Sequence, residues 1–204
     1  MVSNNLARKA TTKGDNMRHL LLAIAALSMW GCAQIPPREV SPPSRQAVVL
    51  DIDGTLTPRN IDVFEPRPGA ADALNALSRK GYIIVYLTTR IPLFQSGLPD
   101  WLRRNGFPSG SLHVAQNAEE RDNADKFKAR ILADYAKAGW SLAYAYGDSS
   151  TDFIAYAKAK IPKEHVFALK RRGSNVCQDG TYHACLEGWA EHLTYIDREI
   201  PNAK

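Results

Sequence analysis

The sequence predicts a three-layer α/β fold, in which helices cover both faces of a parallel sheet of about five strands. Apolar runs rich in β-branched residues alternate along the chain with segments whose apolar residues recur three and four positions apart. Glycine ends most of the helical segments. Polar residues follow directly after three of the strand-like runs, where a sheet of this kind binds its ligands.

The individual elements follow from these patterns. Near-continuous apolar runs are expected as buried strands at residues 46–52, 82–87, 112–115, 142–146 and 166–169. Helical spacing predicts helices at residues 68–81, 101–106, 127–139 and 152–160. Because strand and helix alternate throughout, we expect a Rossmann-like domain over residues 46–204.

Residues 1–31 are typical of a secretory signal sequence, and Met17 is expected to be the true start. The apolar stretch Leu20–Trp30 follows the basic residue Arg18 and is shorter than the roughly 18 residues that a membrane-spanning helix needs. The junction at Cys32 resembles a bacterial lipoprotein signal. This resemblance implies that Cys32 is lipidated and that the protein faces the periplasm from the outer membrane of the cell envelope. Secretion without a lipid anchor and a buried helix are the alternatives.

Residues 32–45 are expected to form a proline-rich tether, because four prolines within eight positions exclude a helix or a central strand. Beyond the tether, the chain holds only Cys177 and Cys185, which lie in a turn-rich stretch. In an oxidising compartment we expect these two cysteines to form a local disulfide. A zinc site is the alternative, for which His183 is the one further ligand nearby.

The positive charge is concentrated at the start of the chain. The whole sequence carries a net charge of +5, and residues 1–31 contribute four basic residues and one acidic residue. The remainder is nearly neutral, so we expect no nucleic-acid partner. The basic run Lys170–Arg172 is expected to be a solvent-exposed part of a loop, with a contact to a phosphate or a lipid headgroup as the alternative.

Polar side chains gather where three predicted strands end. Asp51–Thr55 follow the first strand, Thr88–Arg90 the second and Gly147–Asp152 the fourth. Asp51 and Asp53 lie two positions apart, so their side chains can point to the same side of the strand. Carboxylates this close repel each other unless a cation or a proton lies between them. A set of oxygen ligands without a cluster of His or Cys favours Mg²⁺ over zinc.

Four segments in this order resemble the motifs of the haloacid dehalogenase superfamily of phosphatases. Asp51–Thr57, with the sequence DIDGTLT, resembles its first motif, and Thr88 stands where the second motif requires it. Lys128 fits the third motif, and residues 147–152 resemble the fourth. The match covers residues 48–169 and implies a phosphatase fold.

Within that superfamily, residues 81–90 and 101–110 resemble the domain shared by lipins and membrane-associated phosphatidylinositol transfer proteins. Lipins dephosphorylate phosphatidic acid, whereas the transfer-protein domain lacks the catalytic carboxylates and only binds lipid. Both Asp51 and Asp53 are present in this chain. The resemblance to the lipins therefore implies catalysis rather than binding alone.

The resemblance also implies a role for each motif residue. Asp51 is expected to be the nucleophile that forms an aspartyl-phosphate, and Asp53 the acid and base that protonates the leaving oxygen and later activates water. The implied Mg²⁺ ligands are Asp51, the main-chain carbonyl of Asp53, Asp148 and Asp152. The implied phosphate-binding groups are Thr88, Lys128, Arg90 and the amides of Gly54 and Thr55. Thr89 and Lys126 are the rivals of Thr88 and Lys128.

These residues predict a Mg²⁺-dependent phosphomonoester hydrolase. Only 33 positions separate Thr55 from Thr88, and 40 separate Thr88 from Lys128, so we expect no cap domain. An open site suits phosphatidate or another exposed phosphomonoester. A non-catalytic module that binds phosphate or phospholipid is the alternative function, and a phosphotransferase would use the same residues.

Overall fold

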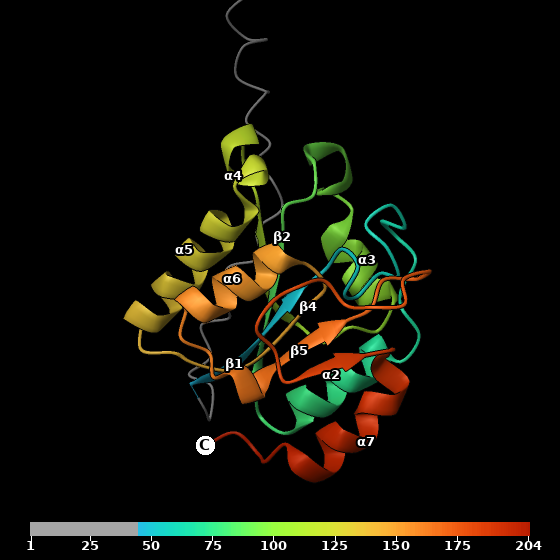
Figure 1. Ribbon diagram of the computed structural model, residues 1–204, viewed down its shortest axis with the longest axis vertical. Helices are drawn as coiled ribbons and strands as arrows, with labels where there is room; N and C mark the ends of the chain where they lie inside the picture. Colours follow the sequence, from blue (N-terminus) through green and yellow to red (C-terminus); the bar gives the residue numbers. More distant parts are fainter. Residues whose placement is uncertain (1–44) are drawn as a thin grey trace, which may run out of the picture. The chain divides into compact units, whose positions relative to one another are not determined.

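The computed structural model describes residues 45–204, so the predicted signal sequence, Cys32 and the tether up to residue 44 lie outside the described residues. Six parallel strands form a single sheet in the order β3-β2-β1-β4-β5-β6 (Figure 1). The strands are β1 (Gln46–Asp51), β2 (Ile83–Thr88), β3 (Gly110–Val114), β4 (Ser141–Gly147), β5 (Val166–Leu169) and β6 (Ala184–Leu186). β1 and β4 therefore lie side by side at the centre of the sheet.

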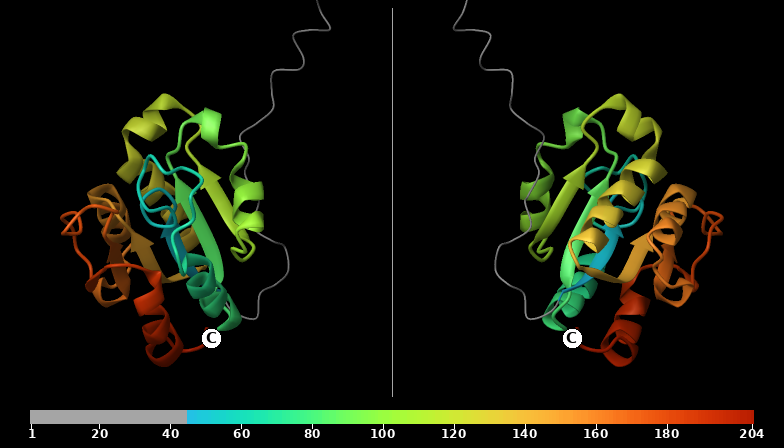
Figure 2. Two further views of the ribbon diagram at one scale, coloured as in Figure 1. Left: turned by 90° about the vertical axis from the view of Figure 1, so that its right-hand side faces the viewer. Right: turned by 90° about the vertical axis from the view of Figure 1, so that its left-hand side faces the viewer.

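Helices cover both faces of this sheet, as Figure 2 shows. The helices are α2 (Ala70–Arg79), α3 (Leu98–Arg104), α4 (Ala118–Asp122), α5 (Ala124–Lys137), α6 (Ser150–Lys158) and α7 (Trp189–Glu199). The chain also forms two short 3₁₀ helices, η1 (Pro92–Phe94) and η2 (Lys163–His165). Buried side chains of α2, α3 and α7 share one hydrophobic core, and those of α5 and α6 share the other. The predicted three-layer α/β fold is confirmed.

Strand β1 shows why the apolar runs become central strands. Val48 and Leu50 belong to the core under α2 and α7, while Ala47 and Val49 belong to the core under α5 and α6. Successive side chains of a strand point to opposite faces, so a strand covered on both faces needs an unbroken apolar run. The run ends at Asp51, which brings a carboxylate to the carboxyl edge of the sheet.

The sheet has six strands rather than about five, because β6 pairs in parallel with β5 at the edge of the sheet. β6 is only three residues long, too short to show a strand period in the sequence. Cys185 lies in β6 and forms the predicted disulfide with Cys177.

Helix α7 was also absent from the sequence-based prediction. It buries Trp189, His192 and Ile196, which are spaced three and four positions apart, so the periodic signal was present but brief. None of the helices over residues 45–204 is long and apolar enough to cross a bilayer.

Candidate active site

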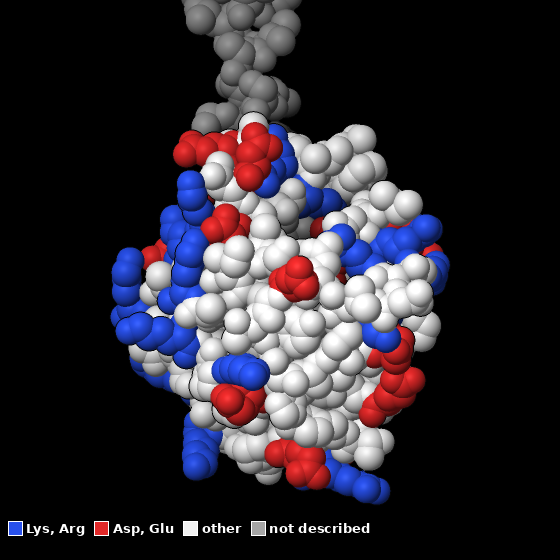
Figure 3. Space-filling model, in the orientation of Figure 1, with Lys and Arg blue, Asp and Glu red and all other residues white. Residues whose placement is uncertain are grey.

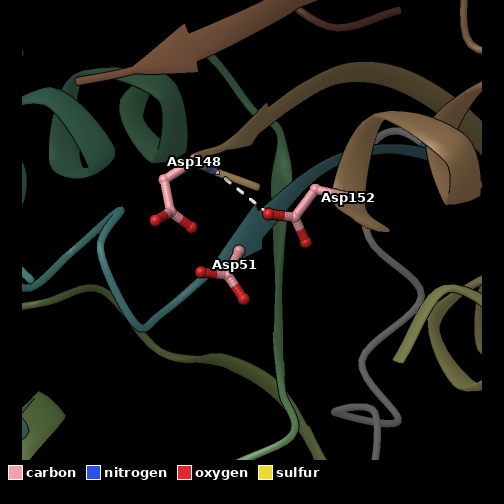
Figure 4. A group of neighbouring side chains, drawn as sticks. All are labelled: Asp51, Asp148 and Asp152. Atoms are coloured by element: carbon pink, nitrogen blue, oxygen red, sulfur yellow. Dashed lines mark hydrogen bonds between the residues drawn. The ribbon is translucent and has the colours of Figure 1, made fainter. Parts of the chain in front are cut away.

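Three buried carboxylates meet at the carboxyl ends of the central strands. Asp51 ends β1, Asp148 follows β4, and Asp152 lies in the first turn of α6. One oxygen from each lies within 4.8 Å of the others (Figure 4). The structure therefore brings together three of the predicted metal ligands from separate segments of the chain.

Asp152 is held in place by the start of α6. Its Oδ2 accepts hydrogen bonds from the backbone N–H groups of Asp148 (3.2 Å) and Ser149 (3.0 Å) and from the Ser149 hydroxyl (2.8 Å). The contact from the Ser149 N–H is part of a capping box between Ser149 and Asp152, which fixes the carboxylate against the helix N-terminus. Oδ1 remains directed toward Lys128. Asp152 thus combines a helix-capping role with a place in the acidic cluster.

Two glycines allow the carboxylates to approach the backbone closely. Gly54 has a φ of 88°, and a Cβ there would lie 2.0 Å from Asp148 Oδ2. At Gly147, a Cβ would lie 2.6 Å from the Asp152 Cβ. A side chain at either position would displace the cluster. The glycines that follow β1 and end β4 are therefore part of the geometry of the site.

Lys128 inserts a buried ammonium group between two of the carboxylates. Its side chain comes from α5 and is 3% exposed. Nζ donates hydrogen bonds to Asp51 Oδ1 and Asp152 Oδ1, and both N–O distances are 2.5 Å. Although burial lowers the pKa of Lys128, the carboxylates of Asp152 and Asp51 outweigh burial and raise that pKa well above its ordinary value. Lys126, the rival residue, is exposed on the same helix.

The crowding of negative charge appears in the pKa values of the carboxyl groups. Burial raises the pKa of Asp51 well above its usual value, Lys128 opposes this, and the neighbouring carboxylates raise the pKa further. The pKa of Asp148 is raised to about 6, by burial first and by Asp152 second, against the opposing effect of Arg171. A divalent cation among these oxygens would offset the repulsion. The all-oxygen donor set fits Mg²⁺.

The carboxylate of Asp53 lies outside this three-carboxylate cluster. Its Oδ2 accepts a hydrogen bond from the Thr88 hydroxyl (2.6 Å), and its Oδ1 accepts one from Arg90 Nε (2.9 Å). Arg90 Nη2 also lies 2.8 Å from Oδ1. Thr88 and Arg90, both predicted to bind phosphate, thus hold and orient the predicted acid–base residue. Thr89, the rival of Thr88, is half-buried.

The turn after Asp53 is internally hydrogen bonded. The Gly54 N–H donates to Thr57 Oγ1 (3.0 Å), and the Thr55 N–H points to the Ile52 carbonyl (3.3 Å). The Thr55 hydroxyl donates to Asp51 Oδ2 (3.2 Å). The turn thus steadies the predicted nucleophile, and phosphate binding by the two amides stays a prediction.

Two arginines near the site were not predicted as site residues. Arg171 Nε contacts Asp148 Oδ2, so one member of the basic run after β5 reaches the acidic cluster. Arg67 Nη2 donates to the carbonyls of Gly54 (2.9 Å) and Lys170 (2.5 Å). The basic run was a visible signal in the sequence, whereas no local pattern distinguishes Arg67.

Exposed apolar side chains lie on the two loops that follow β1 and β2. They are Ile61, Phe64, Ile91 and Leu93, and Leu93 is 76% exposed. The loops contact each other, since the rings of Phe64 and Phe94 pack edge to face with their centroids 6.1 Å apart. The Arg90 guanidinium lies 5.4 Å from the centre of the Phe64 ring, which places these loops directly beside Asp53.

Two solved structures share this fold. A putative haloacid-dehalogenase-like phosphatase from Mesorhizobium loti matches with a TM-score of 0.57 and 16% identity, over 80% of this chain and 91% of that one. D,D-heptose 1,7-bisphosphate phosphatase from Burkholderia thailandensis matches with a TM-score of 0.50 and 14% identity, over 76% of this chain and 99% of that one. At these identities the likeness shows the fold alone.

Curated relatives are much longer proteins. The protein retinal degeneration B of Drosophila melanogaster is 26% identical over 76% of this chain and 12% of its own length. Human membrane-associated phosphatidylinositol transfer protein 3 is 27% identical over 78% of this chain and 16% of its own length. The chain thus spans less than a fifth of these relatives. A family model described as the LNS2 domain of PITM 1-3 matches residues 48–170, from β1 to just beyond β5. The chain therefore belongs to the LNS2 domain family of PITM 1-3.

Proposed function

We propose that this protein is a Mg²⁺-dependent phosphomonoester hydrolase that acts through an aspartyl-phosphate. The observation that carries the proposal is the placement of Asp51. Its carboxylate ends the central strand, shares a buried cluster with Asp148 and Asp152, and receives a hydrogen bond from Lys128. A carboxylate in such a setting is positioned and charge-balanced for attack on phosphorus. The phosphatase folds of the solved neighbours agree with this chemistry.

In the proposed reaction, an oxygen of Asp51 attacks the phosphorus atom and displaces the alcohol. Asp53 gives a proton to the departing alkoxide and later takes one from the water that cleaves the acyl-phosphate, which releases phosphate and restores Asp51. Mg²⁺, when bound by Asp51, Asp148, Asp152 and the Asp53 carbonyl, supplies electrostatic stabilisation of the phosphoryl oxygens. Lys128 adds a fixed positive charge beside the nucleophile.

The exposed apolar loops favour a substrate with an apolar part. Ile61, Phe64, Ile91 and Leu93 lie beside the site and leave apolar surface open to an acyl chain or a membrane. The relatives named as phosphatidylinositol transfer proteins agree with a lipid ligand. Phosphatidate is therefore the first substrate to test, and lipid anchoring through Cys32 in the cell envelope stays a prediction.

A non-catalytic phospholipid-binding module is the second candidate, because curated relatives are named as transfer proteins. The two candidates differ in what Asp51 and Asp53 do. Phosphate release with Mg²⁺ distinguishes an enzyme from a binding module. The yield of phosphorylated glycerol, when glycerol is added, distinguishes a phosphotransferase from a hydrolase.

The test is phosphate release from p-nitrophenyl phosphate and from phosphatidate vesicles, with Mg²⁺ and with a chelator. We expect Mg²⁺-dependent release that Asp51→Asn abolishes. Asp134→Asn is the matched control, because Asp134 is an exposed residue of α5 that pairs with Lys137 and not with a residue of the acidic cluster. Binding of phosphatidate vesicles without any turnover would instead support the module.

A further inference from the structure

A hollow opens beside the acidic cluster, at the same edge of the sheet. It has a volume of about 390 Å³ and lies where the chain leaves β1, β5 and β6. Arg171 lines this hollow, and its Nε contacts Asp148. The hollow is therefore one side chain away from the candidate active site. Ligands of parallel α/β sheets bind outside the carboxyl ends of the strands, which is where this hollow lies.

Basic side chains dominate the hollow. Arg67, Lys170, Arg171 and Arg172 line it, against Glu187 and Glu191. Figure 3 shows a group of basic atoms at the upper right, where the loops after β1 and β5 run in Figure 1. Lys170 is paired with Glu187, Arg171 with Asp148 and Arg172 with Glu65. Arg67 is thus the one basic side chain of the lining that has no carboxylate partner among residues 45–204.

Arg67 brings a buried charge that lacks a carboxylate partner of its own. The residue is 7% exposed, and its Nη2 donates to the carbonyls of Gly54, Pro58 and Lys170. Its Nε is buried without a hydrogen-bond partner among residues 45–204, and no ion pair of Arg67 occurs within that range. Asp148, which attracts it from further away, is already paired with Arg171. A buried guanidinium is normally paired with an anion, so Arg67 lacks one.

Helix α7 begins at the wall of the same hollow. Its first residues, Trp189 to Glu191, line the hollow, and no side chain caps the helix at Gly188. The first N–H groups of a helix have no partner within the helix and carry partial positive charge. The unpaired guanidinium of Arg67 and the start of α7 thus offer donors of the same sign from two elements.

We propose that this hollow binds an oxyanion, a phosphate group, next to the candidate catalytic cluster. The anion is either a second phosphate on the substrate or a separate phosphate ion. The first source rests on the proposed function, whereas binding itself does not. If Arg67 serves only to tie three loops together through its carbonyl contacts, the hollow has no affinity for phosphate.

Isothermal titration of inorganic phosphate into the metal-free full chain tests the proposal, because the unmetallated carboxylates repel phosphate from the cluster. Lys170→Gln is expected to weaken phosphate binding about threefold to tenfold, and Glu187→Gln to strengthen it similarly by freeing Lys170. Lys126→Gln is the control, since it removes the same charge from an exposed site on α5. These rim residues are preferred to Arg67, whose loss would disturb three backbone contacts.

Absence of phosphate binding, or binding that neither Lys170→Gln nor Glu187→Gln alters, would overturn the proposal. The two sources of the anion are separated by kcat/KM of the Mg²⁺-loaded chain for substrates with one and with two phosphates. A second phosphate on the substrate predicts that Lys170→Gln lowers kcat/KM only for the two-phosphate substrate. Unchanged kcat/KM for both, together with weakened phosphate binding, assigns the hollow to a separate ion. The titration measures phosphate binding alone, so it still tests this proposal if the chain shows no hydrolase activity and the proposed function fails.

Discussion

Each carboxylate at the site is tied to a basic side chain. The contacts are Asp51 and Asp152 with Lys128, Asp53 with Arg90, and Asp148 with Arg171. Four carboxylates thus share three cations, which leaves one negative charge in excess within this set of contacts. Burial, and after it the neighbouring carboxylates, raise the pKa values of Asp51 and Asp148. A divalent cation would offset the excess negative charge. This excess also predicts how the site responds to the loss of a cation and to pH.

Replacing Lys128 with Gln is expected to lower phosphate release about 100-fold or more, because a fixed charge beside the nucleophile is lost. The same change leaves Asp51 and Asp152 without their shared cation. We therefore expect the thermal midpoint of the metal-free protein to fall, and Mg²⁺ to restore part of the loss. Lys126→Gln should change neither quantity. A mild effect at Lys128 with a strong one at Lys126 would reverse the assignment.

The stabilisation by Mg²⁺ is expected to depend on pH. In the unfolded chain the Asp148 carboxyl ionises near 3.8, whereas its folded pKa is about 6. Between these values the folded state binds more protons, so the free energy of unfolding contributed by this group falls as pH rises. Mg²⁺ needs the ionised form, and the rise in thermal midpoint on adding it should be larger at pH 7 than at pH 5. In Asp148→Asn this pH dependence should shrink, and an unchanged profile there would contradict the assignment.

At the scale of secondary-structure elements, the sequence predicted those strands and helices whose positions are determined by a local pattern of apolar residues. β1 and β2 are unbroken apolar runs, so their positions and the carboxylates after β1 were predictable. β6 was not, because a three-residue edge strand depends on pairing with β5 rather than on its own pattern. The site residues likewise differ in how far a local pattern could predict them. The acidic residues were predicted from their positions at strand ends, whereas Arg171 reaches Asp148, 23 positions away in the chain, through a tertiary contact that no local pattern indicates.

The disulfide secures the segment between β5 and β6. Cys177 is buried against the α6 face, and Cys185 lies in β6. The double change Cys177→Ser and Cys185→Ser is expected to lower the free energy of unfolding by about 2–3 kcal/mol, from the closure of a short loop in the unfolded chain. Urea unfolding of the oxidised protein and the variant measures this difference. If the variant matches the oxidised wild type, the bond does not stabilise the fold.

At the scale of the whole molecule, the carboxyl edge of the sheet carries both exposed apolar loops and a basic hollow. The loops after β1 and β2 carry the exposed residues Phe64 and Leu93. The hollow is lined by the same loop after β1 and by the segments after β5 and β6, and Arg172 in its lining pairs with Glu65, next to Phe64. An apolar and a basic surface thus adjoin each other beside the candidate site, which suits a substrate that carries both an apolar and an anionic part.

Leu93→Gln tests the apolar side of this arrangement. It is expected to lower hydrolysis of phosphatidate in vesicles severalfold, because apolar contact with the bilayer is lost, and to leave hydrolysis of soluble p-nitrophenyl phosphate unchanged. Ile154→Gln, which alters an exposed apolar residue of α6, is the control. An equal loss on both substrates would show that Leu93 acts on the fold rather than on the lipid surface.

The most direct measurement is the search for phosphate covalently attached to Asp51. The Mg²⁺-loaded protein is mixed with a substrate labelled in its phosphate group, quenched in acid during turnover and digested, and the peptides are analysed by mass spectrometry. We predict an acid-stable phosphoryl group on the peptide that contains Asp51, and its absence in Asp51→Asn. Turnover that persists in Asp51→Asn, with no labelled peptide in either protein, would contradict the account.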